Sequence, residues 1–264
     1  MMASHLSFLS RLITCTLALC CHVITAAPIS TSDKTFTVLC AVPKDHESHE
    51  PIKYAYQKAL RTLGYQLDWQ VVTPARTFHV ITHGRGDAIC LTTPLTLKPF
   101  DTGVGQPLNA ILGSSVIYGW SIRDDIPINE ETLHSRNNFR IGYLKNFTSD
   151  FLLQSEGYTR GIPIKDVSMA AKMLITRRID AMILIETQSF EETLSYWLER
   201  QQSGSSHQLR SNPVGEVFYT PYLHKRHEAL RQPLEHALSK IIEAQGGPIS
   251  RATIAQWQQT VRSR

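Results

Sequence analysis

The hydrophobic and polar positions of this chain form one helix-to-strand pattern twice. In each copy an amphipathic stretch ends at a basic residue, and an Asp-Ala pair then opens an apolar run typical of a buried strand. The copies span residues 73–93 and 166–186, with Asp87 and Asp180 at equivalent positions 93 residues apart. Two similar α/β lobes are the simplest interpretation. Open α/β sheets bind ligands at the carboxyl ends of their strands.

Around both copies the pattern predicts strands that alternate with helices, as in a mainly parallel sheet flanked by helices. Pro51 and Pro74 mark helix starts, and Gly64 and Gly84 mark helix ends. In the first part we expect strands at 36–42, 67–72 and 87–93 and helices at 51–63 and 73–84. Beyond it we expect strands at 108–120, 140–143, 180–186 and 214–222, helices from 148 and at 166–178, 189–200, 228–245 and 250–262, and a polar loop at 203–213.

The first 27 residues have the order of a secretory signal peptide. A weakly basic head precedes an apolar stretch at 12–24 and a small-residue exit at 25–27. We therefore expect cleavage and a periplasmic location, and no later run is long and apolar enough for a membrane helix. We assign residues 28–121 to the first part of lobe 1, 122–213 to lobe 2, and 214–264 to the return into lobe 1.

Charge and motifs narrow the function classes. The formal net charge is +4, and basic residues are scattered among acidic ones rather than gathered in a stripe with aromatic residues. This distribution argues against nucleic-acid binding. No nucleophile elbow, phosphate loop or paired metal motif occurs, so we expect no catalytic residues, no cofactor and no enzyme activity.

Histidine pairs offer a competing interpretation as metal ligands. His79 and His83 are spaced i, i+4 on a predicted helix and could form half of a metal site. Two further close pairs are His46/His49 and His224/His227. No cysteine or acid completes a recognisable spacing, which favours solvated histidines and no bound metal.

Two cysteines remain after removal of the signal peptide. Cys40 and Cys90 both lie in predicted buried strands. In an oxidising compartment such a pair can form a disulfide, but free cysteines also pack well in protein cores. The sequence leaves both arrangements open.

A series of short motifs in a fixed order resembles the type II periplasmic solute-binding proteins of extracellular family 3, which serve amino-acid importers. The motifs lie between about Phe36 and Trp257: a Pro-Ala-Arg helix start at 74–76, Gly-Arg-Gly-Asp-Ala at 84–88, Phe-Arg-Ile-Gly at 139–142, Arg-Ile-Asp-Ala at 178–181, and Tyr-Thr-Pro-Tyr at 219–222. The resemblance implies a two-lobed fold in which each lobe is a mainly parallel sheet flanked by helices, with two crossover strands.

The chain departs from the amino-acid binders of this family at three positions. No aromatic residue follows the first strand, where residues 43–47 read Pro-Lys-Asp-His-Glu. The arginine that the family places after the third strand is absent, and the nearest basic residue is Lys98, a point charge rather than a bidentate fork. The acid of the second lobe stands one residue later than usual, as Glu186.

Strand ends and helix starts nevertheless indicate ligand contacts. Residues 73–76 and 147–150 each follow a strand and begin a helix, so their backbone amides could bind an anion. Arg76 could hold a carboxylate, or could be a solvated first-turn residue. Glu186 could accept an ammonium group, or could pair with a neighbouring base. The predicted ligand-binding set is Arg76, Thr92, Thr93, Lys98, Tyr143, Phe147, Thr148 and Glu186.

These observations together predict a monomeric periplasmic protein that captures a small polar solute by hinge closure. We expect the hinge at residues 118–120 and 215–217, where two strands cross between the lobes. The expected partners are an amino acid or small carboxylate and a membrane permease of an ABC importer. A sensory module that acts through a membrane receptor, and a dehydratase-like or hydrolytic enzyme on the same fold, are the alternatives.

Overall fold

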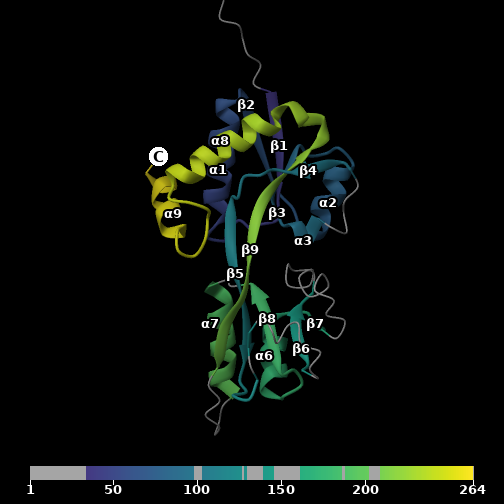
Figure 1. The fold of residues 1–264 in the computed structure, drawn as a ribbon, viewed down its shortest axis with the longest axis vertical. Helices are drawn as coiled ribbons and strands as arrows, with labels where there is room; N and C mark the ends of the chain where they lie inside the picture. Colours follow the sequence, from purple (N-terminus) through teal and green to yellow (C-terminus); the bar gives the residue numbers. More distant parts are fainter. Residues whose placement is uncertain are drawn as a thin grey trace, which may run out of the picture. The chain divides into compact units, whose positions relative to one another are not determined.

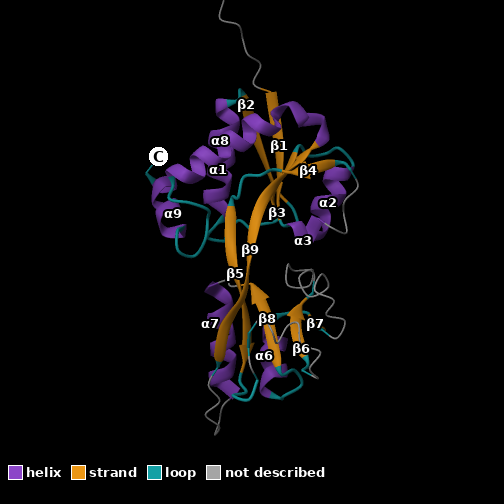
Figure 2. Ribbon diagram, in the orientation of Figure 1, coloured by secondary structure: helices purple, strands orange, loops and turns teal. Residues whose placement is uncertain are grey.

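The computed structural model describes residues 34–97, 103–126, 128–129, 139–145, 161–185, 188–201 and 209–263. The predicted signal peptide and the start of the helix expected from residue 148 lie outside these ranges. Within them, helices alternate with strands as predicted (Figures 1 and 2). No helix in the described ranges is both long and apolar enough to cross a membrane.

The first half of the chain contains β1 to β5. Its elements are β1 (Lys34–Cys40), α1 (His49–Thr62), β2 (Tyr65–Val71), α2 (Pro74–Thr82), β3 (Ala88–Thr92), α3 (Pro94–Leu97), β4 (Gly105–Pro107) and β5 (Gly113–Ser121). The second half contains β6 (Ile141–Leu144), β7 (Ile162–Ile164), α6 (Val167–Ile175), β8 (Ala181–Ile185), α7 (Gln188–Gln201), β9 (Arg210–His224), the 3-10 helix η2 (Lys225–Leu230), α8 (Arg231–Ala244) and α9 (Ile254–Arg262).

The strands follow the order β2-β1-β3-β9-β5-β8-β6-β7, and β4 also pairs with β9. β1 is parallel to β2 and β3, and β6 is parallel to β7 and β8, so each lobe has a parallel portion. β5 and β9 run antiparallel to their neighbours and connect the two groups. This is the two-lobed α/β architecture with two connecting strands that the sequence predicted.

β9 is longer than its hydrophobic pattern suggested. The expected polar loop ended at residue 213, but the strand already begins at Arg210. Residues 210–219 pair with β5, whereas 220–224 pair with β3 and β4. Polar residues such as Ser211 and Asn212 extend the strand because β5 supplies partners for their backbone groups, irrespective of side-chain polarity.

Local signals explain most helix boundaries. α1 buries Ile52, Ala55, Tyr56, Ala59 and Leu60 at helical spacing. Gly64 follows its end at φ +79°, a left-handed conformation that glycine adopts without a steric cost. The helix predicted at 228–245 begins within the 3-10 helix η2 and continues as α8 from Arg231, and a kink at His227 inside η2 precedes it.

A large hydrophobic core joins the N-terminal elements to the C-terminal helices. Phe36 of β1, Tyr56 of α1, Leu234 and Leu238 of α8, and Trp257 of α9 are completely buried in it. Two other clusters lie around β6, β8 and α6, with members such as Met182 and Ile183. The apolar faces of the second copy therefore form cores of their own.

The repeat found in the sequence has matching backbone geometry in both copies. Gly84 and Arg177 occupy equivalent positions and both have positive φ, +70° and +55°. The next residue in each copy donates its N–H to an equivalent helix carbonyl, Arg85 to Val80 and Arg178 to Met173. The repeat in the sequence thus corresponds to a repeated turn as well as to repeated helices and strands.

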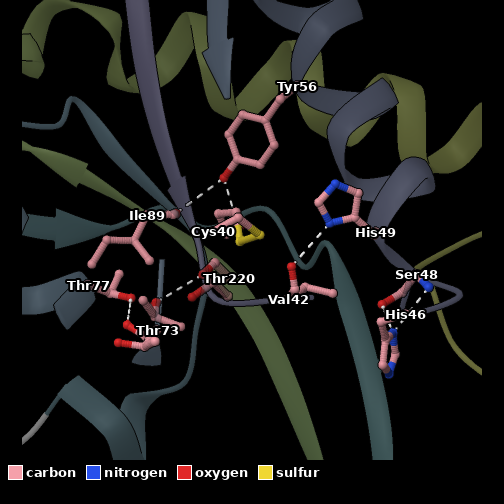
Figure 3. The surroundings of a disulfide bond; sticks show 12 residues. Cys40, Val42, His46, Ser48, His49, Tyr56, Thr73, Thr77, Ile89 and Thr220 are labelled. Carbon is pink, nitrogen blue, oxygen red and sulfur yellow. Dashed lines mark hydrogen bonds between the residues drawn. A yellow bond between two sulfur atoms is a disulfide. The ribbon is translucent and has the colours of Figure 1, made fainter. Parts of the chain in front are cut away.

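The two cysteines form a disulfide between neighbouring parallel strands (Figure 3). Cys40, the last residue of β1, is joined to Cys90 in β3, with a Cα–Cα distance of 5.0 Å. The buried hydroxyl of Tyr56 donates to the carbonyl of Cys90 at 2.9 Å. Of the two arrangements left open by the sequence, the structure has the disulfide.

Candidate functional site

Three of the predicted ligand residues follow or end strands of the first lobe. Arg76 lies in the first turn of α2, just after β2, while Thr92 ends β3 and Thr93 follows it. β1, β2 and β3 are parallel, so their carboxyl ends lie at the same edge of the sheet. This edge is where open α/β sheets bind ligands.

The two threonines at this edge are buried, and their hydroxyl groups already have partners. Thr92 is 3% exposed, and its hydroxyl donates to the carbonyl of Thr220 in β9 at 2.9 Å. Thr93 is 1% exposed, and its hydroxyl accepts the backbone N–H of Thr96 at 3.1 Å. The threonines therefore fix β9 and α3 at this edge.

Arg76 differs from the threonines because its side chain is exposed. Within the described part of the chain, no carboxylate or carbonyl engages its guanidinium group. An exposed arginine without a partner beside a sheet edge is available for a carboxylate ligand. Among the predicted residues that the structure describes, Arg76 is the strongest candidate for a ligand contact.

The backbone at the start of α2 differs from the prediction. Thr73 is the N-terminal cap residue, but its side chain makes no capping hydrogen bond. Its carbonyl instead accepts the N–H groups of Arg76, at 2.9 Å, and Thr77, at 3.1 Å. The prediction of a free amide at Arg76 is therefore wrong, because the helix uses this amide in its own first turn.

Tyr143 comes from the second lobe. It lies in β6, is partly buried, and packs against a cluster that includes Ile117, Ile141 and Ile183. Its role in ligand binding stays a prediction. Lys98, Phe147, Thr148 and Glu186 lie outside the described residues.

Thr220 is a residue of this edge that the sequence analysis did not select. Its carbonyl accepts the hydroxyl of Thr92, while its own hydroxyl oxygen is buried and has no hydrogen-bond partner among the described residues. Its place in the Tyr-Thr-Pro-Tyr motif was a signal. However, pairing with Thr92 joins residues 128 positions apart, which no local pattern reveals.

Asp87 is buried at the opposite, amino-terminal end of β3. Its carboxylate accepts the N–H of Thr37 at 2.6 Å and interacts with Arg226 and His227. Burial raises the pKa of the Asp87 carboxyl, but hydrogen bonds from Thr37, His227 and Arg226, with the charge of Arg226, leave it below its ordinary value. This carboxylate is a structural anchor, since its bonds join β1, β3 and η2.

Asp180 occupies the equivalent position before β8. Its carboxylate accepts the N–H and Nε–H of Arg140, at 2.9 and 3.1 Å, and the Nη1–H of Arg123 at 2.7 Å. Burial raises the pKa of Asp180, and the bonds from Arg140 and Arg123 outweigh this effect and lower it. Both aspartates of the repeat thus have the same anchoring role.

The histidine pairs do not form a metal centre in the described part of the chain, where no three His, Cys, Asp or Glu side chains gather to hold a metal ion. The rings of His79 and His83 lie 4.2 Å apart, and Nδ1 of His83 is 2.7 Å from the carbonyl of His79. His49 is buried beside the carbonyl of Val42, and His227 contacts Asp87. These four histidines thus have contacts with protein groups in the described part of the chain.

Comparison with known proteins assigns the fold. The sensor domain of a histidine kinase, described as similar to periplasmic binding proteins, matches with a TM-score of 0.54 and 10% identity over 88% of this chain and 95% of that chain. Arginine-bound truncated ArgBP from T. maritima matches with a TM-score of 0.51 and 14% identity, over 80% of this chain and 98% of that one.

An ancestral amino acid-binding protein, AncCDT-1, described as a precursor of cyclohexadienyl dehydratase, matches with a TM-score of 0.52 and 11% identity, over 86% of this chain and 94% of that chain. No family model matches the sequence, and no curated protein matches it. The similarity is therefore one of structure. The chain has the two-lobed fold of type II periplasmic binding proteins.

Proposed function

We propose that this chain is a periplasmic solute-binding protein of the extracellular family 3 kind. It captures a small polar solute, an amino acid or a small carboxylate, and delivers it to an ABC importer. The observation that carries the proposal is the exposed guanidinium of Arg76 at the sheet edge, for which the described residues provide no partner. The fold supports the proposal, because the matched proteins of known description include amino-acid binders.

The chemistry of Arg76 favours a carboxylate. A guanidinium group presents a planar fork that can donate two parallel hydrogen bonds to a carboxylate. The positive end of the α2 dipole adds to the attraction for an anion. Thr92 and Thr93 hold β9 and α3 at the same carboxyl edge of the sheet.

Closure requires a segment that can change its backbone angles, and the β5–β9 pair provides one. Its register shifts between Ile117, which pairs with Gly215, and Tyr118, which pairs with Pro213. One extra residue, Val214, therefore stands in β9 and interrupts the ladder. Such a bulge bends a strand and weakens local pairing, so we assign the hinge to this point.

A ligand screen tests the proposal. Purified protein is examined by thermal shift with amino acids and small carboxylates, and each hit is measured by calorimetry. Arg76→Ala should weaken binding of the hit by about 1.5–3 kcal/mol, because a charged hydrogen bond is lost. Arg85→Ala is the matched control, since Arg85 is also exposed but lies at the other end of α2. Equal affinity in all three proteins would contradict the role of Arg76.

A sensory role is the second candidate, and the match to a histidine kinase sensor domain favours it. Transport and sensing differ in the membrane partner rather than in the binding step. Reconstitution in vesicles with a permease encoded beside its gene should give ligand-dependent ATP hydrolysis under the transport role. Ligand-dependent phosphorylation of a kinase partner, without stimulated ATP hydrolysis by the permease, would favour sensing.

We propose binding without chemical conversion, and recovery of the ligand decides against the enzyme alternative. The solute should be recovered intact by mass spectrometry after long incubation with the protein. Steady formation of a product, abolished by Glu186→Gln, would instead indicate a dehydratase or hydrolase.

A further inference from the structure

A surface hollow of about 550 Å³ lies on the first lobe between α1 and β2, and Arg76 is not among its lining residues. One wall is a stripe of α1 formed by Lys53, Gln57 and Arg61. These residues are spaced by four and lie on one side of the helix. Tyr65, Leu67 and Trp69, which alternate along β2 and face the same side of the sheet, also line the hollow.

The hollow is cationic at two points. Lys53 and Arg61 both line it, and no carboxylate does. Lys53 makes a long contact with the exposed Glu50, at 3.8 Å, whereas Arg61 is exposed and has no ion pair in the described part of the chain. The nearby acid of β2, Asp68, belongs to the opposite face and bonds to Thr37 and Gln70.

The open side of the hollow coincides with the end of a sheet. β2 is the first strand in the sheet order, and among the described strands it pairs only with β1 (Figure 2). On its outer edge, alternate residues of Tyr65–Val71 therefore present backbone N–H and C=O groups that no other described strand pairs with. An edge strand with a single charged residue is a surface on which another strand can add.

One donor at this surface lacks a partner. The indole N–H of Trp69 is buried, and no described residue accepts its hydrogen bond. Because this N–H is shielded from solvent, an incoming segment does not reach it, and it contributes nothing to binding. The ring of Trp69 lines the hollow and forms part of its aromatic wall.

We propose that this surface binds an extended acidic segment of another protein, which adds to the free edge of β2. Its backbone groups pair with β2, and its side chains on the α1 side enter the hollow. The segment carries an acidic residue, an apolar residue two positions later, and a second acidic residue two positions after that.

The distance between the two cations of the hollow determines the spacing of acidic residues in the bound segment. Arg61 follows Lys53 by eight positions in α1, which places their Cα atoms about 12 Å apart along the helix axis. In an extended strand, residues four positions apart lie on the same face about 13 Å from each other. Two acids at this interval can meet both cations, while the apolar residue between them covers Leu67.

Fluorescence polarisation with a labelled seven-residue peptide tests the proposal on the full chain. The peptide has glutamate at its second and sixth positions, leucine at the fourth and threonine elsewhere. We expect saturable binding that weakens with added salt. A peptide with lysine in place of both glutamates should not bind, nor should the glutamate peptide with methylated backbone nitrogens, which cannot form a ladder.

Charge-reversed proteins make the test specific. Lys53→Glu and Arg61→Glu should each weaken binding of the glutamate peptide by on the order of tenfold, and the double variant should prefer the lysine peptide. Lys240→Glu, an exposed site on α8 outside the hollow, has the same change of charge and should have no effect. Circular dichroism and the melting temperature check that the variants remain folded.

Several results would overturn the proposal. They are absence of saturable binding at peptide concentrations on the order of 1 mM, equal binding of both peptides, or unchanged binding in the two charge-reversed variants. Self-association through β2 in sedimentation experiments, abolished by Arg61→Glu, would assign the edge to a second copy instead. The proposal is independent of the solute site, so Arg76→Ala should bind the peptide normally.

Discussion

Thr37 and Asp87 are joined by two hydrogen bonds of opposite direction: the N–H of Thr37 donates to the carboxylate of Asp87 at 2.6 Å, and the N–H of Asp87 donates to the carbonyl of Thr37 at 2.8 Å. Arg140 and Asp180 form the same pair of bonds in the second lobe, at 2.9 and 2.8 Å. Each lobe thus ties the start of its Asp-Ala strand to a neighbouring segment, which explains why an aspartate precedes the apolar run in both copies.

The first prediction concerns the Asp87 anchor. Asp87→Asn keeps the shape of the side chain but leaves Arg226 without its anion. We expect the free energy of unfolding to fall by about 2–3 kcal/mol, less than for a fully buried pair because Arg226 is partly exposed. Urea denaturation measures the change. Asp45→Asn, at an exposed position, is the control and should change the free energy of unfolding by less than about 0.5 kcal/mol.

The second prediction concerns the loss of stability at low pH. The pKa of Asp87 is lowered in the folded protein, while in the unfolded chain it lies near its ordinary value of about 3.9. The unfolded state therefore binds the proton more readily, so the contribution to stability is present above about pH 4 and is lost as the pH falls through the folded pKa. Unfolding free energies measured across this range should show a shallower acid decline in Asp87→Asn. An identical decline in both proteins would contradict the anchor.

The third prediction concerns the repeated left-handed turn. Arg177 has φ +55°, at which a side chain is strained, and Gly84 at +70° is its equivalent. Arg177→Gly should raise the free energy of unfolding by about 0.5–1 kcal/mol, while Gly84→Ala should lower it by about 1 kcal/mol. Arg178→Gly is the control: among the described non-glycine residues only Arg177 has positive φ, so this change should not stabilise the protein.

The fourth prediction concerns the disulfide. The bond between Cys40 and Cys90 closes a loop with a sequence separation of 50 residues, so its removal should lower the free energy of unfolding by about 2–4 kcal/mol. Urea denaturation with and without reductant measures the loss. The double variant Cys40→Ala, Cys90→Ala should be insensitive to the reductant. Equal stability of the native protein under both conditions would mean that the bond is absent or without effect.

Much of the fold followed from local patterns. The apolar stripe of α1 and the glycine at residue 64 predicted a helix and its end, which agree with the structure within two residues. β4 and β7, of three residues each, were missed because such short segments show no periodicity. The start of β9 was missed because its pairing with β5, rather than its own side chains, stabilises residues 210–213.

The candidate site was less accessible to sequence reasoning. Arg76 could be selected from its place after a strand, but whether it had a partner depended on which side chains folding brought near it. Thr93 was expected to contact a ligand, yet its hydroxyl binds Thr96. The hydrogen bond from the hydroxyl of Thr92 to the carbonyl of Thr220 could not be predicted, because it joins distant parts of the chain.

By itself, the sequence determined the alternation of helices and strands, the 93-residue repeat and the two-lobed architecture, because spacing along the chain directly encodes which faces of local elements are apolar. Only the tertiary structure decided the disulfide, the ion pairs of Asp87 and Asp180, and the free edge of β2 beside Lys53 and Arg61. Those features depend on distances between groups far apart in the sequence. Such distances are fixed by packing of the whole core, which no local pattern contains.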